Sequence, residues 1–455
     1  MDTKKLRQKI LDLAIHGKLV PQDPNDEPAS VLLERIHAEQ EQLIKEGKIK
    51  APKKSKTAGD TSHYGKEGPF EVPCGWEWRL LADVGRWQSG ATPSRGVSAY
   101  YGGTIPWLKT GDLNDSYIKI IPEHITDKAL AETSVKLNPA GSVLIAMYGA
   151  TISKVGILTF PATTNQACCA CSEFNGVSSK YLFYFLISHR EAFTRQGGGG
   201  AQPNISKEII INTPIPIPPE KEQEKIVNAI EGWFNLISQV ENAELSLRIS
   251  IDTCKTKILD LAVHGNLVPQ VSTDEPAIEL LKRINPAFKP SDNLHYGGVL
   301  PDGWTVCRLD DIIEYEQPQA YIVESTDYSD LYSIPVLTPG KSFILGYTNE
   351  TKGICNTLPV IIFDDFTTES KYVDFPFKVK SSAMKILRTK GEVDIRYIAL
   401  FMSITRLVGD THKRYWISEY SQICIPIPPL QEQRRIVSTV DSLFTQLDSL
   451  SNSIK

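Results

Sequence analysis

The sequence lacks the short motifs by which several classes of enzyme are recognised. It has no GxxxxGK[ST] loop for nucleotide phosphates, no glycine-rich strand-to-helix turn for S-adenosylmethionine and no Asn-Pro-Pro-aromatic tetrapeptide. Pro218-Pro219 has neither the preceding Asn nor the following aromatic residue, and no carboxylate cluster with a nearby Lys stands out. These absences argue against a self-contained ATPase, methyltransferase or nuclease.

Excess charge and paired cysteines are also missing. Lys and Arg number 49 against 54 Asp and Glu, a net charge of -5, so any polyanion must be bound by local patches rather than by bulk charge. The eight Cys have no paired spacing, and the run Cys168-Cys169-Ala170-Cys171 has no second pair at zinc spacing, so we expect reduced core thiols and no metal. No 18-residue apolar run and no apolar signal region are visible, which makes the cytoplasm the expected location.

Two internal repeats organise the 455 residues, a length that favours two to four domains. The stretch 215–227, IPIPPEKEQEKIV, returns at 425–437 as IPIPPLQEQRRIV. The stretch 9–21, KILDLAIHGKLVP, returns at 257–269 as KILDLAVHGNLVP, and this match continues without a gap to Arg283-Ile284. The middle of the chain therefore has a second copy whose halves lie at opposite chain ends, a circular permutation of a tandem duplication.

The central copy predicts one long helix between about 220 and 264. Apolar residues recur alternately four and three positions apart from Ile226 to Leu261, with Glu244 as the exception, which is the a/d pattern of a coiled coil. Pro218-Pro219 suits the helix entry and Gly265 the helix stop. Its predicted length is roughly 65 Å.

The split copy repeats the same apolar pattern in its two halves. We expect the chain ends to meet, so that the C-terminal and N-terminal helices together mimic the central helix and pack antiparallel to it about a pseudo-twofold axis. The alternative is two unrelated amphipathic helices on separate cores.

Two segments, about 64–214 and 296–424, lie between the helical repeats. Their sequences resemble each other only at the beginning and the end. Each opens with His-Tyr-Gly and a Gly-Trp pair, and each ends with a core helix before IPIPP. Ser142–Met147 and Leu358–Phe363 read as buried strands, so we expect α+β modules. The Lys-rich stretch 47–61 is predicted to be a tether, with phosphate contact as the alternative.

Amide, hydroxyl and basic side chains cluster in turns of both modules. Asn and Gln can pair with adenine, Arg and Lys with guanine or phosphate, and Gly permits close backbone approach. For each turn the alternative is an ordinary surface turn, and for 411–416 a surface strand. Asp364 and Asp365 are a weak metal candidate because neighbouring strand side chains face opposite ways.

These features resemble the specificity subunit of type I restriction–modification systems. The resemblance rests on two variable modules closing on IPIPPxxEQ, on the KILDLAxHGxLVPQ repeat, on GATPS (90–94), IPWLKTGDL (105–113), NQA (165–167) and QPNIS (202–206), and on IIFDD (361–365) with KYVDFPFKV (371–379). It implies that each module is a target recognition domain for one half of a bipartite DNA sequence. It also implies helices that fix the gap and dock two methyltransferase subunits, and through them two endonuclease/translocase subunits.

The expected fold is therefore α+β, with two α/β target recognition domains separated by two long antiparallel coiled-coil helices. The expected segments are 1–63, 64–214 (first module), 215–295, 296–424 (second module) and 425–455. No cofactor is expected in this chain, because S-adenosylmethionine, ATP and Mg²⁺ belong to the partner subunits. We expect double-stranded DNA to contact Thr92, Ser94, Arg95, Lys109, Thr110, Gly111, Tyr148, Thr151, Lys154, Asn165, Gln166, Gln196, Gly198, Gln202, Asn204, Tyr347, Thr348, Asn349, Thr367, Ser370, Lys371, Lys413, Arg414 and Tyr415. For partner subunits we expect Ile226, Trp233, Ile237, Ile258, Ile436 and Leu443.

Two other classes of function compete with this interpretation. One is an enzyme that acts alone, which the missing motifs disfavour. The other is a scaffold that uses the helices without reading DNA. A gel-shift experiment with the methyltransferase partner separates them, because only a specificity subunit would bind one bipartite sequence.

Overall fold

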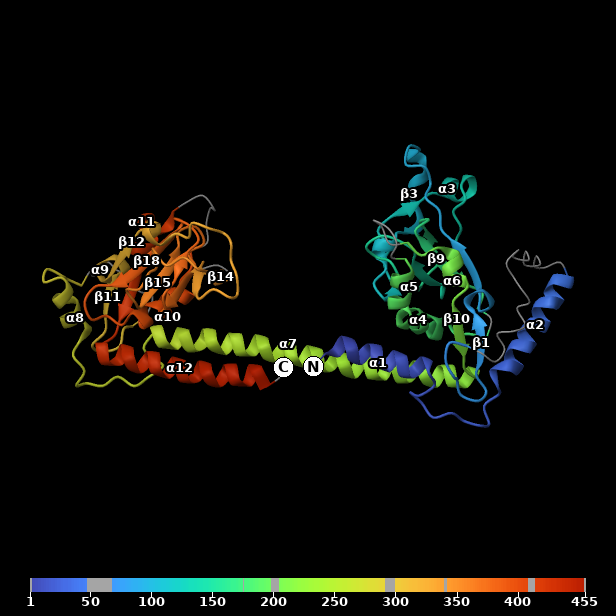
Figure 1. Ribbon diagram of the computed structural model, residues 1–455, viewed down its shortest axis with the longest axis horizontal. Helices are drawn as coiled ribbons and strands as arrows, with labels where there is room; N and C mark the ends of the chain where they lie inside the picture. The colour runs from blue at the N-terminus through green and yellow to red at the C-terminus, as the bar shows by residue number, and fades with distance from the viewer. Residues whose placement is uncertain are drawn as a thin grey trace. The chain divides into compact units, whose positions relative to one another are not determined.

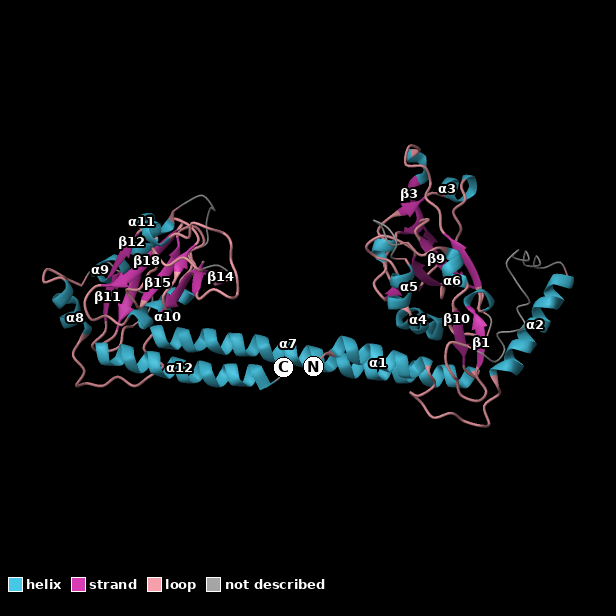
Figure 2. Cartoon of the chain, in the orientation of Figure 1, coloured by secondary structure: helices cyan, strands magenta, loops and turns pink. Residues whose placement is uncertain are grey.

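The computed structural model describes residues 2–46, 68–174, 176–197, 204–290, 299–338, 342–407 and 414–453. The chain mixes helices and sheets (Figures 1 and 2) and divides by its contacts into two compact units, Met1–Asn242 (unit one) and Ala243–Lys455 (unit two). The tether predicted at 47–61 lies outside the described residues.

Unit one holds a five-stranded sheet in the order β2-β9-β6-β7-β4, a three-stranded sheet β5-β3-β8 and the pair β1-β10. Its strands are β1 (Glu77–Leu80), β2 (Arg86–Ser89), β3 (Tyr101–Leu108), β4 (Ser116–Ile118), β5 (His124–Ile125), β6 (Val143–Ala146), β7 (Val155–Leu158), β8 (Thr163–Thr164), β9 (Cys168–Ser172) and β10 (Pro214–Ile217). Its helices are α1 (Thr3–Ile15), α2 (Ala29–Lys45), α3 (Asp127–Glu132), α4 (Ser179–Ser188), α5 (Arg190–Gln196) and α6 (Lys207–Ile211).

Unit two is built on different sheets, in the orders β12-β18-β15-β16, β14-β13-β17 and β11-β19. Its strands are β11 (Thr305–Arg308), β12 (Ile313–Glu316), β13 (Ile334–Leu337), β14 (Ile344–Thr348), β15 (Val360–Asp364), β16 (Ser370–Val373), β17 (Lys378–Val379), β18 (Met384–Thr389) and β19 (Cys424–Ile427). Its helices are α8 (Ala277–Ile284), α9 (Leu309–Ile312), α10 (Ile395–Ile404), α11 (Tyr415–Ser418) and α12 (Leu430–Ser453).

The two predicted core strands and two predicted core helices are confirmed. All four residues of β6 are buried, and β15 is buried from Val360 to Phe363, because each strand is covered on both faces. The predicted helices are α4 and α10. Ser178 caps α4 by accepting from the Tyr181 N–H, and Asp394 caps α10 by accepting from the Arg396 N–H.

The long helix is confirmed as α7 (Glu220–Val263), which runs for 44 residues. Both it and α1 end on a glycine in the left-handed region, Gly265 at φ +71° and Gly17 at φ +66°. A Cβ on Gly17 would lie 2.3 Å from Pro73 Cγ, and one on Gly265 would lie 2.3 Å from Pro301 Cγ. The repeated His-Gly therefore stops each helix and lets the entry of a module pack against that stop.

The predicted a/d seam of α7 is only partly buried. Ile226, Ile230, Ile237 and Ile251 are buried, but Trp233, Val240 and Leu247 are 50%, 48% and 42% exposed. In unit one the neighbouring position Phe234 packs against the core instead, and the Arg7 guanidinium of α1 lies 5.0 Å from its ring centroid. At this point the side chain that faces the module is therefore Phe234 rather than the predicted Trp233, as the 3.6-residue period of a helix packed on a module allows.

Helices α1 and α12 each lie along a part of α7 within their own unit (Figure 1). In unit one Arg7 of α1 forms an ion pair with Glu241, and in unit two Lys255 pairs with Asp448 of α12. The ends of the chain at Met1 and 454–455 are outside the described residues. Their predicted meeting stays a prediction.

The repeated IPIPPxxEQ phrase forms the joint between each module and its helix. Its IPI residues are the strands β10 and β19, which pair antiparallel with β1 and β11. The buried phenol of Tyr181 donates to Pro216 O at 2.8 Å, and that of Tyr397 donates to Pro426 O at 2.8 Å. The same hydrogen bond thus locks a core helix onto each strand.

The Glu and Gln of the phrase are buried on the first turn of α7 and α12. Glu222 accepts from Trp76 Nε1 at 3.0 Å and from Gln22 Nε2 at 3.1 Å, and Glu432 accepts from Gln270 Nε2 at 3.1 Å. Burial raises the pKa of the Glu432 carboxyl. Each Glu therefore connects the start of a long helix to the Val-Pro-Gln end of the other repeated stretch. We call this contact, together with the contacts of the next residue of the phrase, Gln223 or Gln433, the Glu–Gln joint.

Gln223 and Gln433 complete the joint by two shared contacts, and Gln223 Nε2 also donates to Gly176 O at 2.7 Å. Gln223 Oε1 accepts from the Ser178 N–H and Gln433 Oε1 from the Asp394 N–H, both at 2.8 Å. Their Nε2 groups donate to Pro218 O at 3.1 Å and to Pro428 O at 2.9 Å. One Gln side chain in each unit thus pairs with a backbone N–H at the start of a core helix and with a backbone carbonyl just before the long helix.

We predict that Gln433→Leu lowers the free energy of unfolding by about 2–4 kcal/mol, because a buried N–H and a buried C=O lose their partners. Urea unfolding of the full-length chain measures the change. Gln446→Leu, the same substitution at an exposed position of α12, should change the value by less than about 0.5 kcal/mol. Equal effects of the two substitutions would contradict the proposed role of the joint.

Candidate nucleic-acid interface

Three turns of the first module meet at one edge of its sheets. Strands β3 and β8 are parallel, with Trp107 opposite Thr163, so the residues after them emerge together. The Asn165 N–H donates to Leu108 O at 2.9 Å, and the Ala91 N–H donates to Thr164 O at 3.0 Å. The predicted contacts Thr92, Lys109, Asn165 and Gln166 are thereby gathered, and the Thr92 hydroxyl donates to Gln166 Oε1.

A charged cluster lies at this edge. The Glu123 carboxylate forms ion pairs with Lys109 and with Arg95, the latter at 3.0 Å. The Lys109 ammonium, and then Arg95, hold the pKa of Glu123 below its ordinary value. The Arg95 guanidinium lies 4.5 Å from the Tyr101 ring centroid and 5.1 Å from that of Trp107, a cation–π arrangement on one face.

The second predicted group of this module lies between β6 and β7 and beside Asn204. The backbone of Tyr148 forms an isolated antiparallel β-bridge with Asn204, and the Ile205 N–H donates to Met147 O at 2.8 Å. Burial raises the pKa of Tyr148, and a hydrogen bond with Gln166 partly opposes this rise. Gln166 therefore connects the two groups. Thr151 and Lys154 are half-buried in the same turn and Gln196 is exposed at the end of α5, whereas Gly198 and Gln202 lie outside the described residues.

Buried polar atoms without a partner also lie in these turns. Among the described atoms, Thr164 Oγ1, Asn165 Oδ1 and Ser153 Oγ have no hydrogen-bond partner. Thr164 and Asn165 press against Gly90, where a Cβ would meet the Asn165 carbonyl at 2.2 Å. Only glycine fits there, and the unpaired side-chain oxygen of Asn165 is an amide acceptor of the type that pairs with a base edge.

The remaining predicted residues of this module differ in exposure. Ser94 and Gly111 are exposed, and Thr110 is half-buried in a short turn fixed by Asp112, whose carboxylate accepts from the Lys109 N–H at 2.9 Å. Sequence reasoning missed Glu123, the residue that organises both cations. It precedes a two-residue strand and no local pattern marks it.

In the second module, the β15–β16 turn brings together part of the predicted set. Thr367 and Lys371 are exposed, Ser370 is half-buried, and Arg414 is exposed just before α11. Tyr415, by contrast, is 3% exposed and packs in the core, so its ring has no surface to offer DNA. Lys413 lies outside the described residues.

The predicted group at the end of β14 is separate from that turn. Thr348 is 1% exposed, and its hydroxyl accepts from the Glu350 N–H at 3.2 Å, which is a structural contact. Tyr347 lines a shallow hollow of about 400 Å³ and Asn349 is exposed. These residues belong to the sheet β14-β13-β17, whereas Thr367 and Ser370 lie on the sheet of β15 and β16.

The two aspartates considered as metal ligands have other partners. Asp364 accepts from the N–H groups of Phe366 and Thr367, and Asp365 pairs with Lys385. Within the described ranges, no three His, Cys, Asp or Glu side chains are grouped to hold a metal ion, and no helix is long and apolar enough to cross a bilayer.

Comparison with known proteins shows which family carries this arrangement. The family model described as the type I restriction modification DNA specificity domain matches residues 73–247 and 301–455. The chain belongs to the type I restriction–modification specificity subunits. The EcoAI specificity subunit of Escherichia coli is 26% identical over 99% of this chain and 90% of its own length. The EcoR124I/EcoR124II specificity subunit of E. coli is 52% identical over 31% of this chain and 37% of its own.

A solved structure from work on complex assembly and conformational transition of the type I R-M system has the same fold. It superposes with a TM-score of 0.59 at 17% sequence identity, over 85% of this chain and 94% of that one.

In this specificity subunit three of the six residues expected to bind partner subunits are internal. Ile226 and Ile436 are fully buried and Ile237 is 3% exposed, so each packs within this chain instead of facing a partner. Ile258 and Leu443 are half-buried, and Trp233 is half exposed. These three assignments are wrong, because the apolar seam positions concerned pack in the cores of this chain.

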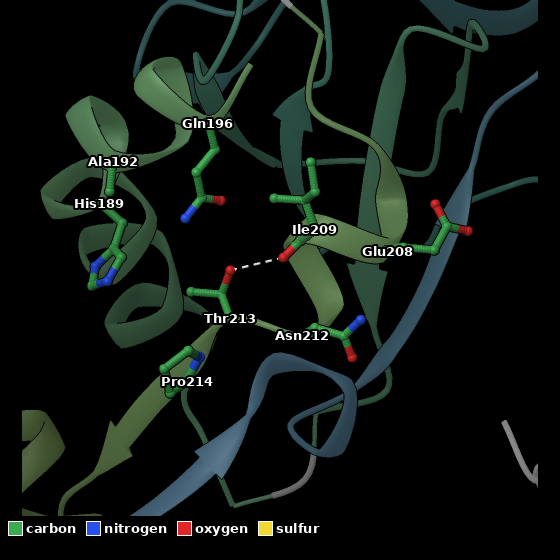
Figure 3. Close-up of a pocket in the computed structure, with 8 residues that line it drawn as sticks. All are labelled: His189, Ala192, Gln196, Glu208, Ile209, Asn212, Thr213 and Pro214. Atoms are coloured by element: carbon green, nitrogen blue, oxygen red, sulfur yellow. Dashed lines mark hydrogen bonds between the residues drawn. The ribbon is translucent and has the colours of Figure 1, made fainter. Parts of the chain in front are cut away.

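A hollow of about 520 Å³ lies between α5, α6 and β10 (Figure 3), and contains none of the predicted residues except Gln196. The Thr213 hydroxyl donates to Ile209 O at 2.9 Å along its wall. His189 stacks on Phe185 with ring centroids 4.3 Å apart, and burial lowers its pKa to about 4. His189 is therefore neutral at physiological pH.

We predict that His189 makes the specificity subunit acid-sensitive. The pKa of His189 is about 4 in the folded chain, against about 6.5 unfolded, so its stabilising contribution is complete above pH 6.5 and is lost as pH falls toward 4. Between pH 7 and pH 5 the wild type should lose about 2 kcal/mol more unfolding free energy than His189→Phe. Urea unfolding at both pH values measures this, and parallel losses would refute it.

Proposed function

We propose that each module reads one half of an asymmetric bipartite sequence in double-stranded DNA. In this proposal α7, with α1 and α12, sets the distance between the halves and docks two methyltransferase subunits, and through them two endonuclease/translocase subunits. The chain itself does not catalyse. The partners supply adenine methylation and ATP-dependent cleavage with S-adenosylmethionine, ATP and Mg²⁺, in the cytoplasm.

One observation carries this proposal: the Glu–Gln joint makes equivalent Gln–Glu and Gln–backbone hydrogen bonds in both units, while the sheets that it holds differ. An equivalent attachment with unlike contents suits two readers of unlike half-sites. A symmetric pair of modules would instead favour a palindrome. The unbroken course of α7 between its two joint-bearing ends supports the role of a spacer.

The side chains of the first module support sequence-specific recognition of DNA rather than general electrostatic attraction to its phosphates. Its gathered edge combines the amides of Asn165 and Gln166, the hydroxyl of Thr92 and the cations of Arg95 and Lys109. Amides and guanidinium groups pair with adenine and guanine edges in the major groove. A net charge of -5 gives little general attraction to phosphate, so the local cations and the partner subunits must provide it.

Sequencing the methylated positions in a host that carries this chain and its partners tests the proposal. The expected result is one asymmetric motif with two specified halves and a fixed number of unspecified bases between them. A continuous or palindromic motif would overturn the bipartite model. Sequence-independent binding of DNA by the complex would support the scaffold alternative instead.

We predict that replacing residues 68–213 by the module of another family member changes only one half of the methylated motif, because the joint residues outside that range are retained. Motif sequencing before and after replacement measures the result. The matched control replaces 299–423 and should change only the other half. A change in both halves after either replacement would contradict independent reading.

We predict that Glu123→Gln raises the affinity of the complex for non-cognate DNA by about three- to tenfold, because Arg95 and Lys109 lose their internal counter-ion. The slope of log K against log salt should steepen by about 1 for each released cation. Fluorescence anisotropy measures both quantities. Glu173→Gln, which removes the exposed partner of Arg86 on β2, is the control and should leave both unchanged. Equal behaviour of the two variants would exclude this role for Glu123.

A further inference from the structure

The turn between β15 and β16 in unit two is held by an unusual number of its own hydrogen bonds. The Asp364 carboxylate accepts from the N–H groups of Phe366 at 2.8 Å and Thr367 at 3.2 Å, and the Asp364 N–H donates to Glu369 O at 2.8 Å. Thr368 is fully buried at φ +56°, a conformation that a β-branched residue adopts only when its surroundings fix it. The turn is therefore a rigid block.

This block fastens two segments that are distant in sequence. The Leu407 N–H, after α10, donates to Thr368 Oγ1 at 3.2 Å. The Tyr415 N–H and the Trp416 N–H, at the start of α11, donate to Asp365 O at 2.9 Å and to Asp365 Oδ1 at 2.8 Å. The described residues on both sides of 408–413 are thus tied to the same turn.

The Asp365 carboxylate is fixed in turn by a buried cation. Lys385 Nζ on β18 lies 3.3 Å from Asp365 Oδ2, and these side chains are 1% and 2% exposed. Lys385 also donates to Gln317 Oε1 at 3.0 Å and lies 5.8 Å from the Tyr315 ring centroid.

Stability alone does not account for such a pair. Replacing a buried ion pair by apolar side chains of similar size is often neutral or stabilising, because desolvation offsets the attraction. What an apolar pair could not supply is the acceptor for the Trp416 N–H. The benefit of Asp365 is therefore the placement of the backbone at Tyr415 and Trp416.

The segments held by this turn carry exposed side chains. Thr367 and Arg414 are exposed, and Arg406 is 58% exposed and pairs with Glu369 at 3.3 Å. Phe366, in the turn, and Ile417, in α11, are 37% and 59% exposed. Two arginines, a hydroxyl and two apolar side chains on a rigid support suit a DNA groove, where guanidinium groups meet guanine or phosphate and apolar groups meet thymine methyls.

We propose that Asp365 is a positioning residue for half-site selection by the second module. Lys385 is its buried counter-charge, and Thr368, which accepts from the Leu407 N–H, is the second residue that holds the neighbouring backbone. Asp365 holds Arg414 and Arg406 in one arrangement with Thr367, so that a wrong base meets a surface that cannot adjust. This inference rests on the proposed function, and it adds which buried groups set selectivity.

Two double variants distinguish the role of the ion pair from the role of the hydrogen bond that Asp365 Oδ1 accepts from the Trp416 N–H. In Asp365→Asn/Lys385→Met the charges are removed, but Asn Oδ1 still accepts from the Trp416 N–H. In Asp365→Leu/Lys385→Met both the charges and the acceptor are removed. Glu350→Gln/Lys378→Met is the matched control, because Lys378 and Glu350 form another largely buried pair in unit two, at 2.8 Å, on a different sheet.

The readout is selection from a DNA library randomised in each half-site, with each variant assembled with its methyltransferase partners. We expect Asp365→Leu/Lys385→Met to lose at least tenfold in discrimination at the second half and to keep the first half unchanged. The Asn/Met variant and the Glu350/Lys378 control should stay within threefold of wild type in both halves. Thr368→Val, a nearly isosteric change, should lower discrimination at the second half several-fold.

Three outcomes would overturn the proposal. One is wild-type discrimination by the Leu/Met variant or, if that variant does not fold, by Thr368→Val. Another is an equal loss in the Asn/Met variant, which would assign the effect to charge rather than to that hydrogen bond. The third is an equal loss in the control at matched unfolding midpoint. A wild-type complex that selects no bipartite sequence would instead refute the proposed function itself.

Discussion

The architecture depends on a buried carboxylate and amide at the first turn of each long helix. Glu222 and Gln223 in one unit, and Glu432 and Gln433 in the other, are almost fully buried, and burial of such groups is tolerable only because each is hydrogen-bonded. Their partners come from the module entry, the core helix and the Val-Pro-Gln stretch of the repeat. The joint therefore determines where a module stands on its helix, whatever the module contains.

This dependence explains why repetition and variation coexist in one chain. The joint contacts are side chain to backbone or between repeated side chains, so they place no demand on the sheet beyond the IPI strand and a capped helix. Within that constraint unit one builds a five-stranded sheet and unit two a four-stranded one. The faces that we assign to DNA lie on these unconstrained parts, in turns after strands.

The repeat was the part of the structure most accessible to sequence reasoning. The long helix, the core strands and the core helices could be predicted because periodicity, caps and glycine stops are local signals. The face of α7 that is buried could not, because Phe234 and Trp233 are equally apolar and only the module decides between them. Likewise, Tyr415 beside basic residues suggested DNA contact, yet its position in the core depends on β15 and β18. Glu123 and the Asp365–Lys385 pair are products of tertiary contact and leave no local trace in the sequence.

The near-identity of the two His-Gly stretches has a genetic consequence. Each stretch ends a helix and receives a module through the same glycine–proline contact, Gly17 with Pro73 and Gly265 with Pro301. A crossover between genes at either stretch would exchange whatever follows and retain the glycine–proline contact at the junction. New combinations of modules can thus arise in one recombination event.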